Sequence, residues 1–398
     1  MLCMLAGEAA RRFGGRAAFD TGGCTLSFAE LDRLSDGVAA GMAHRGVRIG
    51  DLVALVLPDG IEYPICFVAA AKLGAVAAGV PPGRPGVLHG LAPTLVVTER
   101  GLLPPLPGQD VVTLPGGGYD GRARGPYDPG RLRGLLRAES PPPPLPPDPR
   151  RPVAVVFTRG RRGPPRGAVF ADAQLEAIRA HGAGSRWGTG DARLVNRPLT
   201  QVGFTTRIPV FLQTGRTVHV LPRWEPEAAL RVMVDHGLGV LQGTPDQLAA
   251  VLAVDGTPPP VRLVLSSGGP ARPELVRELR ERFGAPVCNR YMCTEAGLGL
   301  GTRPEDPPED AEHSVGRPRS GVALSVRDPA GRPVPEGGVG EVLLRSNAVM
   351  AGYRGDPVAS SRVIARDGYV RTGDMGFIDQ GGRLRLVATG DLDAESRT

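Results

Sequence analysis

The chain has 398 residues, of which 41% are hydrophobic, and its 47 basic and 41 acidic side chains give a formal net charge of +6. At roughly 150 residues per domain, this length predicts two or three folding units with sizeable cores. No apolar run approaches the roughly 18 residues of a membrane helix, and the N-terminus lacks the pattern of a signal peptide, so we expect neither membrane insertion nor secretion.

The cysteines and histidines form no pattern typical of a metal site. The five cysteines contain no C-x-x-C pair, and the six histidines show neither metal nor triad spacing, so we assign none of the histidines a role. Because no disulfide framework is indicated, we expect a reducing, cytoplasmic location. Lys72 is the only lysine, so any chemistry that needs a lysine has one candidate.

Helix and strand patterns begin to alternate at Ser27, where Ser27 and Glu30 form an S-x-x-E capping box and Gly46 suits the end of the helix. The apolar residues on one face of this helix are Leu31, Leu34, Val38 and Met42. The elements predicted next are strand Leu52–Leu57, helix Ile61–Leu73, strand Gly74–Val80 and strand Thr94–Thr98. This alternation predicts βαβ units around a parallel sheet.

Residues 101–152 are rich in proline and glycine and end in P-P-P-P-L-P-P-D-P. Proline at this density does not sustain a helix or a central strand and favours extended polyproline conformation. We therefore expect a surface connection, partly disordered, with no ligand of its own.

The stretch Val153–Val169 joins a short apolar strand pattern to a loop. The loop contains three glycines and four arginines, at Gly160, Gly163, Gly167, Arg159, Arg161, Arg162 and Arg166. Glycines let backbone N–H groups approach a ligand closely, and arginine can hold a phosphate through two parallel hydrogen bonds. An exposed basic turn, or a basic arm for nucleic acid, is the alternative interpretation.

Beyond this loop the alternation resumes and predicts one large α/β body over residues 1–313. The predicted helices are Ala171–Ala180, Phe204–Leu212, Pro226–His236, Pro245–Leu252 and Pro273–Phe283, and the predicted strands are Arg193–Asn196, Thr217–Leu221, Leu238–Leu241, Val261–Leu265 and Pro286–Asn289. Short apolar runs between glycine-containing turns predict a small β-rich subdomain over residues 314–390.

Ligands of α/β folds collect at the carboxyl ends of the strands. Three predicted loops lie at such ends, Thr158–Gly167, Ser266–Pro270 and Tyr291–Glu295. We expect the binding site to draw on these loops.

Seven stretches of the sequence form an ordered series of motifs. They are Leu26–Asp32 (L-S-F-A-E-L-D), Ala71–Pro81 (A-K-L-G-A-V-A-A-G-V-P), the Val153–Val169 loop, Leu265–Pro270 (L-S-S-G-G-P), Asn289–Glu295 (N-R-Y-M-C-T-E), Gly340–Tyr353 (G-E-V-L-L-R-S-N-A-V-M-A-G-Y) and Tyr369–Asp374 (Y-V-R-T-G-D). In this order they resemble the motifs of the adenylate-forming enzymes, which include acyl-CoA synthetases, the adenylation domains of peptide synthetases and luciferases.

This resemblance implies a layered αβαβα body that ends in a small distorted β-barrel. It also implies that a carboxylic acid is activated with ATP and Mg²⁺ as an acyl-adenylate, which passes to coenzyme A or to a carrier-protein phosphopantetheine. By the same resemblance, Thr294 and Glu295 are catalytic and Glu295 holds the metal. The residues implied to bind the nucleotide are Thr158, Gly160, Arg166, Gly268, Gly269, Tyr291 and Asp374.

Each of these residues also has a plain structural interpretation. Gly268 and Gly269 suit a strand-to-helix turn, Glu295 suits the start of a helix, and Asp374 suits a turn beside Gly373.

The sequence departs from the family pattern at several positions. Arg159, Arg161 and Arg162 replace small hydroxyl residues of the loop, and Arg166 replaces its lysine. Met292 replaces a glycine, and Gln201 replaces a histidine near the acyl pocket of many acyl-CoA synthetases. Cys293 suits a packed small residue better than a nucleophile. At Ala388–Gly390 the family's glycine and arginine are missing, and we expect its C-terminal lid domain, with the reactive-site lysine, to be absent.

Three hypotheses follow. The first is an acid-activating enzyme that is slow alone or is completed in trans by a carrier protein or a separate C-terminal domain. The second is a degenerate, non-catalytic scaffold that binds an acyl group or a nucleotide within a biosynthetic assembly. The third is a nucleic-acid binder that uses the arginine loop, which is disfavoured because interleaved aromatic residues are lacking.

Overall fold

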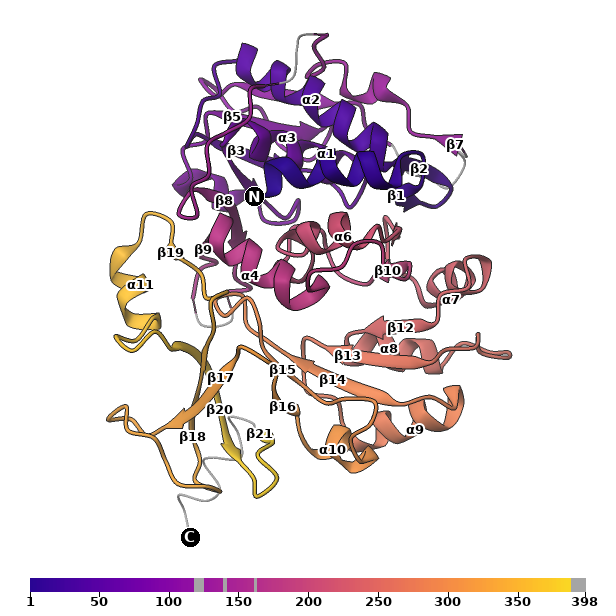
Figure 1. Ribbon diagram of the computed structural model, residues 1–398, viewed down its shortest axis with the longest axis vertical. Coiled ribbons are helices and arrows are strands. Elements are labelled where there is room, and N and C mark those ends of the chain that lie inside the picture. The colour runs from indigo at the N-terminus through magenta and orange to yellow at the C-terminus, as the bar shows by residue number, and fades with distance from the viewer. Residues whose placement is uncertain (118–124, 139–141, 161–162, 388–398) are drawn as a thin grey trace. The chain divides into compact units, whose positions relative to one another are not determined.

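The computed structural model describes residues 1–117, 125–138, 142–160 and 163–387 (Figure 1). The chain forms two compact units. The first unit comprises Met1–Trp224 and Tyr353–Gly355, and the second comprises Glu225–Gly352 and Asp356–Thr398. The boundary expected from the sequence, between residues 313 and 314, divides the chain differently and stays a prediction, and residues 388–390 of that predicted subdomain lie outside the described residues.

The main sheet of the first unit has the strand order β19-β9-β8-β4-β3-β5-β6. Its strands are β3 (Leu52–Val56), β4 (Val76–Gly79), β5 (Leu95–Glu99), β6 (Val111–Leu114), β8 (Pro152–Phe157), β9 (Gly167–Ala171) and β19 (Gly352–Tyr353). From β8 to β6 all neighbouring strands pair in parallel. Every residue of β3 is buried, as expected for a strand with both faces covered. The predicted parallel sheet is confirmed.

Three helices of the first unit pack on one another, and α3 also packs on β3 and β4 (Figure 1). They are α1 (Leu2–Phe13), α2 (Phe28–His44) and α3 (Glu62–Leu73). The predicted capping box starts α2, because the Ser27 hydroxyl accepts a hydrogen bond from the Glu30 N–H at 3.2 Å and the Glu30 carboxylate accepts one from the Ser27 N–H at 2.8 Å. Helix α1 had not been predicted.

Lys72, the only lysine, fastens α3 to α2. Its ammonium group donates hydrogen bonds to Asp32 Oδ1 at 2.7 Å and to Asp36 Oδ1 at 2.6 Å, and the side chain is only 8% exposed. The two carboxylates lie one turn apart on α2, so they share one face of that helix. The only lysine of the sequence therefore holds helices α2 and α3 together.

The expectation for residues 101–152 was wrong in part. The described residues of this segment include β6, a short strand β7 (Gly125–Pro126) and a 3₁₀ helix, η2 (Pro129–Leu132). Strand β6 itself contains no proline. Val111 and Val112 can therefore pair with β5 at the edge of the sheet.

This connection also packs on α2. Leu132 and Leu135 are fully buried. A Cβ at Gly41 would lie 1.5 Å from the Leu135 carbonyl oxygen, and the Arg137 N–H donates to the Gly37 carbonyl at 3.1 Å. The two glycines thus allow the backbone of the connection to touch the helix.

A second sheet of the first unit has the order β10-β11-β1-β2-β7. It adds strands β1 (Ala17–Thr21), β2 (Cys24–Ser27), β10 (Arg193–Val195) and β11 (Val218–Val220). The other helices of this unit are η1 (Pro85–Gly90), α4 (Asp172–Ala183), α5 (Val202–Thr205) and α6 (Ile208–Thr214). The helix predicted over Phe204–Leu212 is therefore two short helices, which are separated by Thr206 and Arg207.

The described residues of the second unit form two sheets. One, with the order β12-β13-β14-β15-β16, comprises Val240–Gly243, Leu263–Ser267, Val287–Tyr291, Leu300–Gly301 and Arg317–Pro318. Its helices are α7 (Pro226–Asp235), α8 (Pro245–Leu252), α9 (Pro273–Phe283) and α10 (Pro308–His313). The other sheet is antiparallel, β17-β18-β20-β21, with strands Ala323–Arg327, Gly340–Arg345, Val370–Ile378 and Leu384–Val387, and is accompanied by α11 (Pro357–Val363).

These elements confirm the predicted α/β class with a small β-rich part toward the C-terminal end (Figure 1). Among the described residues, no helix combines the length and the apolar character needed to cross a membrane.

Candidate functional site

The loop between β8 and β9, in the first unit, is closed at its base by two of the predicted residues. The Thr158 N–H donates to the Arg166 carbonyl at 2.9 Å, and the Arg166 N–H donates to the Thr158 hydroxyl at 3.0 Å. The two strands form a hairpin around this pair, since Phe157 is in register with Gly167. The return strand β9 had not been predicted.

Gly160 is needed for the shape of this loop. Its φ is +71°, and a Cβ there would lie 2.7 Å from the Gly163 carbonyl oxygen and 3.1 Å from Pro165 Cδ. Any larger residue would combine backbone strain with a steric clash. Arg161 and Arg162, singled out from the sequence, lie outside the described residues.

An arginine from another segment of the first unit contacts the loop. The Arg84 guanidinium donates to the Arg159 carbonyl at 2.7 Å. Burial first, and the nearby positive charge of Arg159 second, lower the pKa of Arg197 to about 10. The Arg166 guanidinium carbon lies 5.7 Å from the centre of the Tyr353 ring, a cation–π contact. Sequence reasoning had missed Arg84 and Arg197, because nothing local links them to the loop.

The segment that carries Arg197 is held by buried polar contacts. The Leu199 N–H donates to Asp59 Oδ1 at 2.7 Å, and the Thr205 hydroxyl donates to the Leu199 carbonyl at 2.7 Å. Burial raises the pKa of Asp59 to about 6. The Thr200 hydroxyl is buried and has no hydrogen-bond partner in the described structure.

In the second unit, two predicted loops leave the same edge of the sheet. Strands β13 and β14 are parallel neighbours, with Ser267 in register with Arg290. Gly268 and Tyr291 therefore follow at corresponding positions. Gly268 has a φ of +90°, which favours glycine at the turn after β13.

Tyr291 and Asp374 meet directly within this unit. The Tyr291 hydroxyl donates a hydrogen bond to Asp374 Oδ2 at 2.8 Å. Burial first and the Asp374 charge second raise the pKa of Tyr291 far above its usual value. The phenol is therefore a permanent donor that orients the carboxylate.

Cys293 and Glu295 complete this group in the second unit. Burial raises the pKa of the Cys293 thiol well above its usual value, and the charges of Glu295 and Asp374 add to the effect. The thiol is therefore protonated, in agreement with a packed residue and not a nucleophile. The Glu295 carbonyl accepts a hydrogen bond from the Met350 N–H at 2.9 Å, and Thr294 lies in the turn between Cys293 and Glu295.

Grouped in this way, the predicted residues form one set in each unit. Thr158, Gly160 and Arg166 share the β8–β9 loop of the first unit. In the second unit, Tyr291, Glu295 and Asp374 are near neighbours, and Gly268 leaves the same sheet edge as Tyr291.

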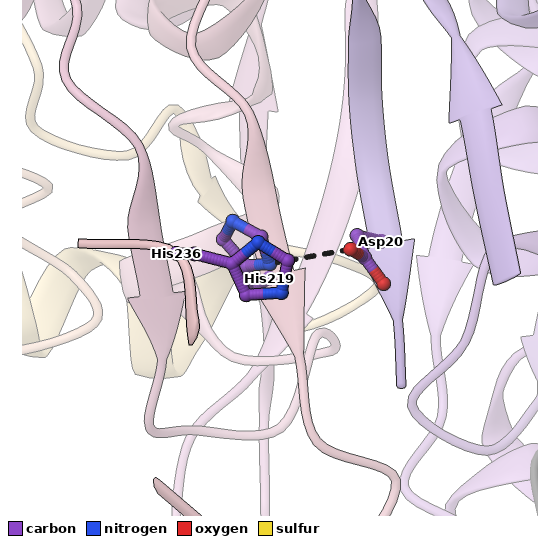
Figure 2. A group of neighbouring side chains, drawn as sticks. All are labelled: Asp20, His219 and His236. Atoms are coloured by element: carbon purple, nitrogen blue, oxygen red, sulfur yellow. Dashed lines mark ion pairs between the residues drawn. The ribbon is translucent and has the colours of Figure 1, made fainter. Parts of the chain in front are cut away.

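One buried pair involves a histidine that had been given no role. Asp20 on β1 and His219 on β11 are in register, and His219 Nδ1 lies 3.5 Å from Asp20 Oδ2 (Figure 2). Asp20 Oδ1 also accepts a hydrogen bond from the Gly23 N–H at 2.9 Å. The pair links two strands of the first unit, and the third side chain drawn in Figure 2, His236, belongs to the second unit.

Comparison with known proteins gives matches over nearly the whole chain. A family model described as AMP-binding enzyme matches residues 7–354. The 4-coumarate–CoA ligase 5 of Oryza sativa subsp. japonica is 27% identical over 389 residues, which cover 92% of this chain and 71% of that protein. The salicyl-AMP ligase / salicyl-S-ArCP synthetase of Mycobacterium tuberculosis is 30% identical over 410 residues, which cover 92% of this chain and 69% of that protein.

Solved structures match the fold as well. The inhibitor-bound N-terminal domain of FACL13 from Mycobacterium tuberculosis aligns with a TM-score of 0.83 at 22% identity, and the alignment covers 97% of this chain and 99% of that one. At this identity the likeness concerns the fold alone.

Proposed function

Because this chain belongs to the AMP-binding enzyme family, as the match over residues 7–354 shows, we propose that it activates a carboxylic acid with ATP as an acyl-adenylate. In this reaction an oxygen of the acid attacks the α-phosphorus of ATP, the bond to the β-phosphate breaks, and pyrophosphate leaves. The names of the relatives support this class, since one is a CoA ligase and another is a salicyl-AMP ligase.

The observation that carries the proposal is the Tyr291–Asp374 hydrogen bond beside Glu295. Asp374, held by a donor that stays protonated, presents a fixed acceptor suited to the ribose hydroxyls. Glu295 supplies a carboxylate oxygen, the ligand type that Mg²⁺ prefers. Mg²⁺, when bound, supplies positive charge that neutralises the triphosphate. Thr294, in the same turn, is proposed to contact phosphate.

The glycines and the arginine loop are proposed to take the rest of the nucleotide. Gly268 and Gly269 leave room for the adenine ring beside the end of β13. Thr158, Gly160 and Arg166 would bind the β- and γ-phosphates in the β8–β9 loop. The acyl-adenylate would then pass to the thiol of coenzyme A or of a carrier-protein phosphopantetheine, with a carrier protein or a separate C-terminal domain as partner in trans.

A non-catalytic scaffold is the second candidate, and Lys72 is the observation that favours it. The only lysine of the chain is buried between two aspartates, so it is not available to stabilise a reacting group. Removing a positioned cation from an active site typically costs about a hundredfold or more in rate, so residues 1–398 alone would turn over slowly if they have no other such cation. A protein of this kind would bind an acyl group or nucleotide without turnover.

Acid-dependent exchange of labelled pyrophosphate into ATP tests the proposal, with a panel of aryl, alkyl and dicarboxylic acids. We expect exchange with at least one acid and a loss of about a hundredfold in Glu295→Gln. Glu336→Gln, which removes an exposed carboxylate of the same unit, is the matched control and should retain exchange. Thermal unfolding with MgATP and with non-hydrolysable acyl-adenylate analogues separates the candidates. A stabilising shift without exchange would favour the scaffold, and the absence of both would refute each of them.

A further inference from the structure

Helix α10 forms hydrogen bonds with a strand of the β12–β16 sheet. The side-chain amide of Asn289, in β14, donates to the Ala311 carbonyl at 2.6 Å and to the Ser314 carbonyl at 2.8 Å. Asn289 is only 7% exposed and stands two residues before Tyr291, which ends the same strand. The C-terminal end of α10 is therefore fixed to the strand that carries Tyr291.

The carboxylate of Asp310 joins the same helix to the hairpin of β20 and β21. Asp310 Oδ1 forms an ion pair with the Arg383 guanidinium, and Asp310 Oδ2 accepts a hydrogen bond from Arg317 Nη1 at 2.9 Å. Arg383 lies in the turn of the hairpin, where its Nε also donates to Asp379 Oδ2 at 2.9 Å. Because Asp310 is only 1% exposed, its charge depends on these two arginines.

Backbone hydrogen bonds continue this attachment. The Val315 N–H donates to the Leu384 carbonyl at 2.9 Å, and the Leu384 N–H donates to the Gly316 carbonyl at 2.9 Å. The segment that follows α10 is thus paired with the first residue of β21. Helix α10 therefore connects β14 of one sheet to the β20–β21 hairpin of the other.

Strand β20 is irregular where Asp374 lies. The register of β18 and β20 shifts between Glu341 and Leu343 of β18, and the Asp374 N–H donates to the Thr372 hydroxyl at 3.1 Å. Such a bulge changes the direction in which a side chain leaves its strand and locally disrupts the ladder. The ladder alone therefore does not fix the direction of Asp374, and the attachment of the hairpin becomes important.

We infer that Asp310 is a positioning residue, which holds the β20–β21 hairpin against α10 so that Asp374 stays within hydrogen-bond distance of Tyr291. Since β14 is fixed to the same helix, α10 sets the separation of these two side chains. Asp310 lies outside the seven sequence motifs. The hydrogen bond belongs to the folded chain itself, and only its use for a ribose rests on the proposed function.

Glu312 provides a matched comparison on the same helix. Its side chain is only 8% exposed and forms ion pairs at 2.9 Å with Arg277 and with Arg280, both of α9. Asp310 and Glu312 thus each pair with two arginines, but the partners of Glu312 belong to α9 and not to the hairpin. Removing either charge should destabilise the unit, and only the loss of Asp310 should affect Asp374.

NMR of protein labelled at the ring Cζ of its six tyrosines tests the inference without a ligand. Tyr291→Phe identifies the Tyr291 signal as the one that disappears. We expect Asp310→Asn to shift this signal toward that of a phenol in water, because the phenol loses its carboxylate acceptor, and Glu312→Gln to leave it in place. An unchanged signal in Asp310→Asn, or an equal shift in Glu312→Gln, would overturn the inference. If Asp310→Asn does not fold, Arg383→Gln replaces it, with the same expectation.

Calorimetry with a non-hydrolysable acyl-adenylate analogue and its 2′,3′-dideoxy counterpart measures the contribution of the ribose hydroxyls. We expect wild type and Glu312→Gln to prefer the analogue with the hydroxyls about tenfold, and Asp310→Asn to prefer it less than about threefold. A general loss of stability would weaken both ligands alike and leave this preference unchanged. A full preference in Asp310→Asn would therefore contradict the positioning role.

The two proposals fail separately. A wild type without any preference for the ribose hydroxyls removes the ribose role proposed for Asp374, while the Tyr291 signal still decides whether Asp310 positions the pair. Acid-dependent exchange together with an unchanged Tyr291 signal in Asp310→Asn removes the positioning role and leaves the enzymatic proposal intact.

Discussion

The Tyr291 hydroxyl and the Asp374 carboxylate are 83 positions apart in the chain and 2.8 Å apart in the second unit. One residue ends β14 and the other lies within β20, so strands of two different sheets supply the pair. A neutral phenol that donates to a carboxylate fixes the direction in which the remaining lone pairs point. A ligand with two neighbouring hydroxyl groups can donate hydrogen bonds to these oriented lone pairs.

We predict that Tyr291→Phe weakens binding of an acyl-adenylate analogue about tenfold, because Asp374 loses the donor that orients it. Calorimetry of the analogue measures this change. The same substitution should leave tripolyphosphate binding unchanged, since tripolyphosphate has no ribose. An equal loss for both ligands would show that the phenol supports the fold and not the ribose site.

Asp59 predicts a specific dependence of stability on pH. Its pKa is raised to about 6 by burial, so between about pH 4 and pH 6 the folded state retains a proton that the unfolded state releases. The contribution of this group to stability therefore falls as the pH rises through that window, by roughly 2 to 3 kcal/mol in all. Asp59→Asn keeps an acceptor for the Leu199 N–H and removes the titration.

Urea unfolding at several pH values compares wild type with Asp59→Asn. We expect the stability of the variant, relative to wild type, to increase from pH 4 to pH 7. Asp255→Asn, at an exposed position, should show no such trend. A constant difference between wild type and Asp59→Asn across the range would contradict the raised pKa.

Lys72→Met should destabilise the first unit by about 1 to 3 kcal/mol, because it leaves the carboxylates of Asp32 and Asp36, which are 26% and 28% exposed, without their cation. Arg33→Met, on the exposed side of α2, should cost less than about 0.5 kcal/mol. The triple variant Lys72→Met, Asp32→Asn, Asp36→Asn should recover much of the loss. Chemical denaturation measures all three, and a triple variant no more stable than Lys72→Met would show that the lysine acts through its packing alone.

Gly160→Ala should reduce tripolyphosphate and ATP binding about tenfold, since the added methyl group meets the Gly163 carbonyl in a backbone conformation that alanine avoids. Gly83→Ala is the control, because a Cβ there meets nothing within 4 Å. Equal affinities for both variants would mean that the shape of the loop is not required for anion binding.

Local signals explain which elements could be predicted from the sequence. Helix α2 begins where Ser27 and Glu30 predict it, because a capping box acts within four residues. Helix α1 was missed because no capping residue marks its start, since Met1 at the N-cap makes no side-chain capping hydrogen bond. Strand β6 was missed because the composition of its surroundings outweighed two valines in register with β5.

The same distinction, between residues with a local sequence signal and residues without one, applies to the candidate site. The loop glycines and the residues of the second unit were predicted because short motifs carry them, although their roles stay proposals. The contact of Arg84 with the loop had no such signal, because its hydrogen bond to the Arg159 carbonyl joins residues 75 positions apart in the chain. Contacts of this kind are set by tertiary structure and leave no spacing in the sequence.

The contact between Gly41 and Leu135 limits how this protein can be shortened or redesigned. The proline-rich connection looks dispensable from its composition, yet its backbone occupies the volume that a side chain at position 41 would fill. Removal of residues 132–137 would leave a gap on the surface of α2, because Gly37 and Gly41 have no side chains to fill it. A minimal version of the first unit must therefore keep that stretch, or replace both glycines with larger residues in the same design step.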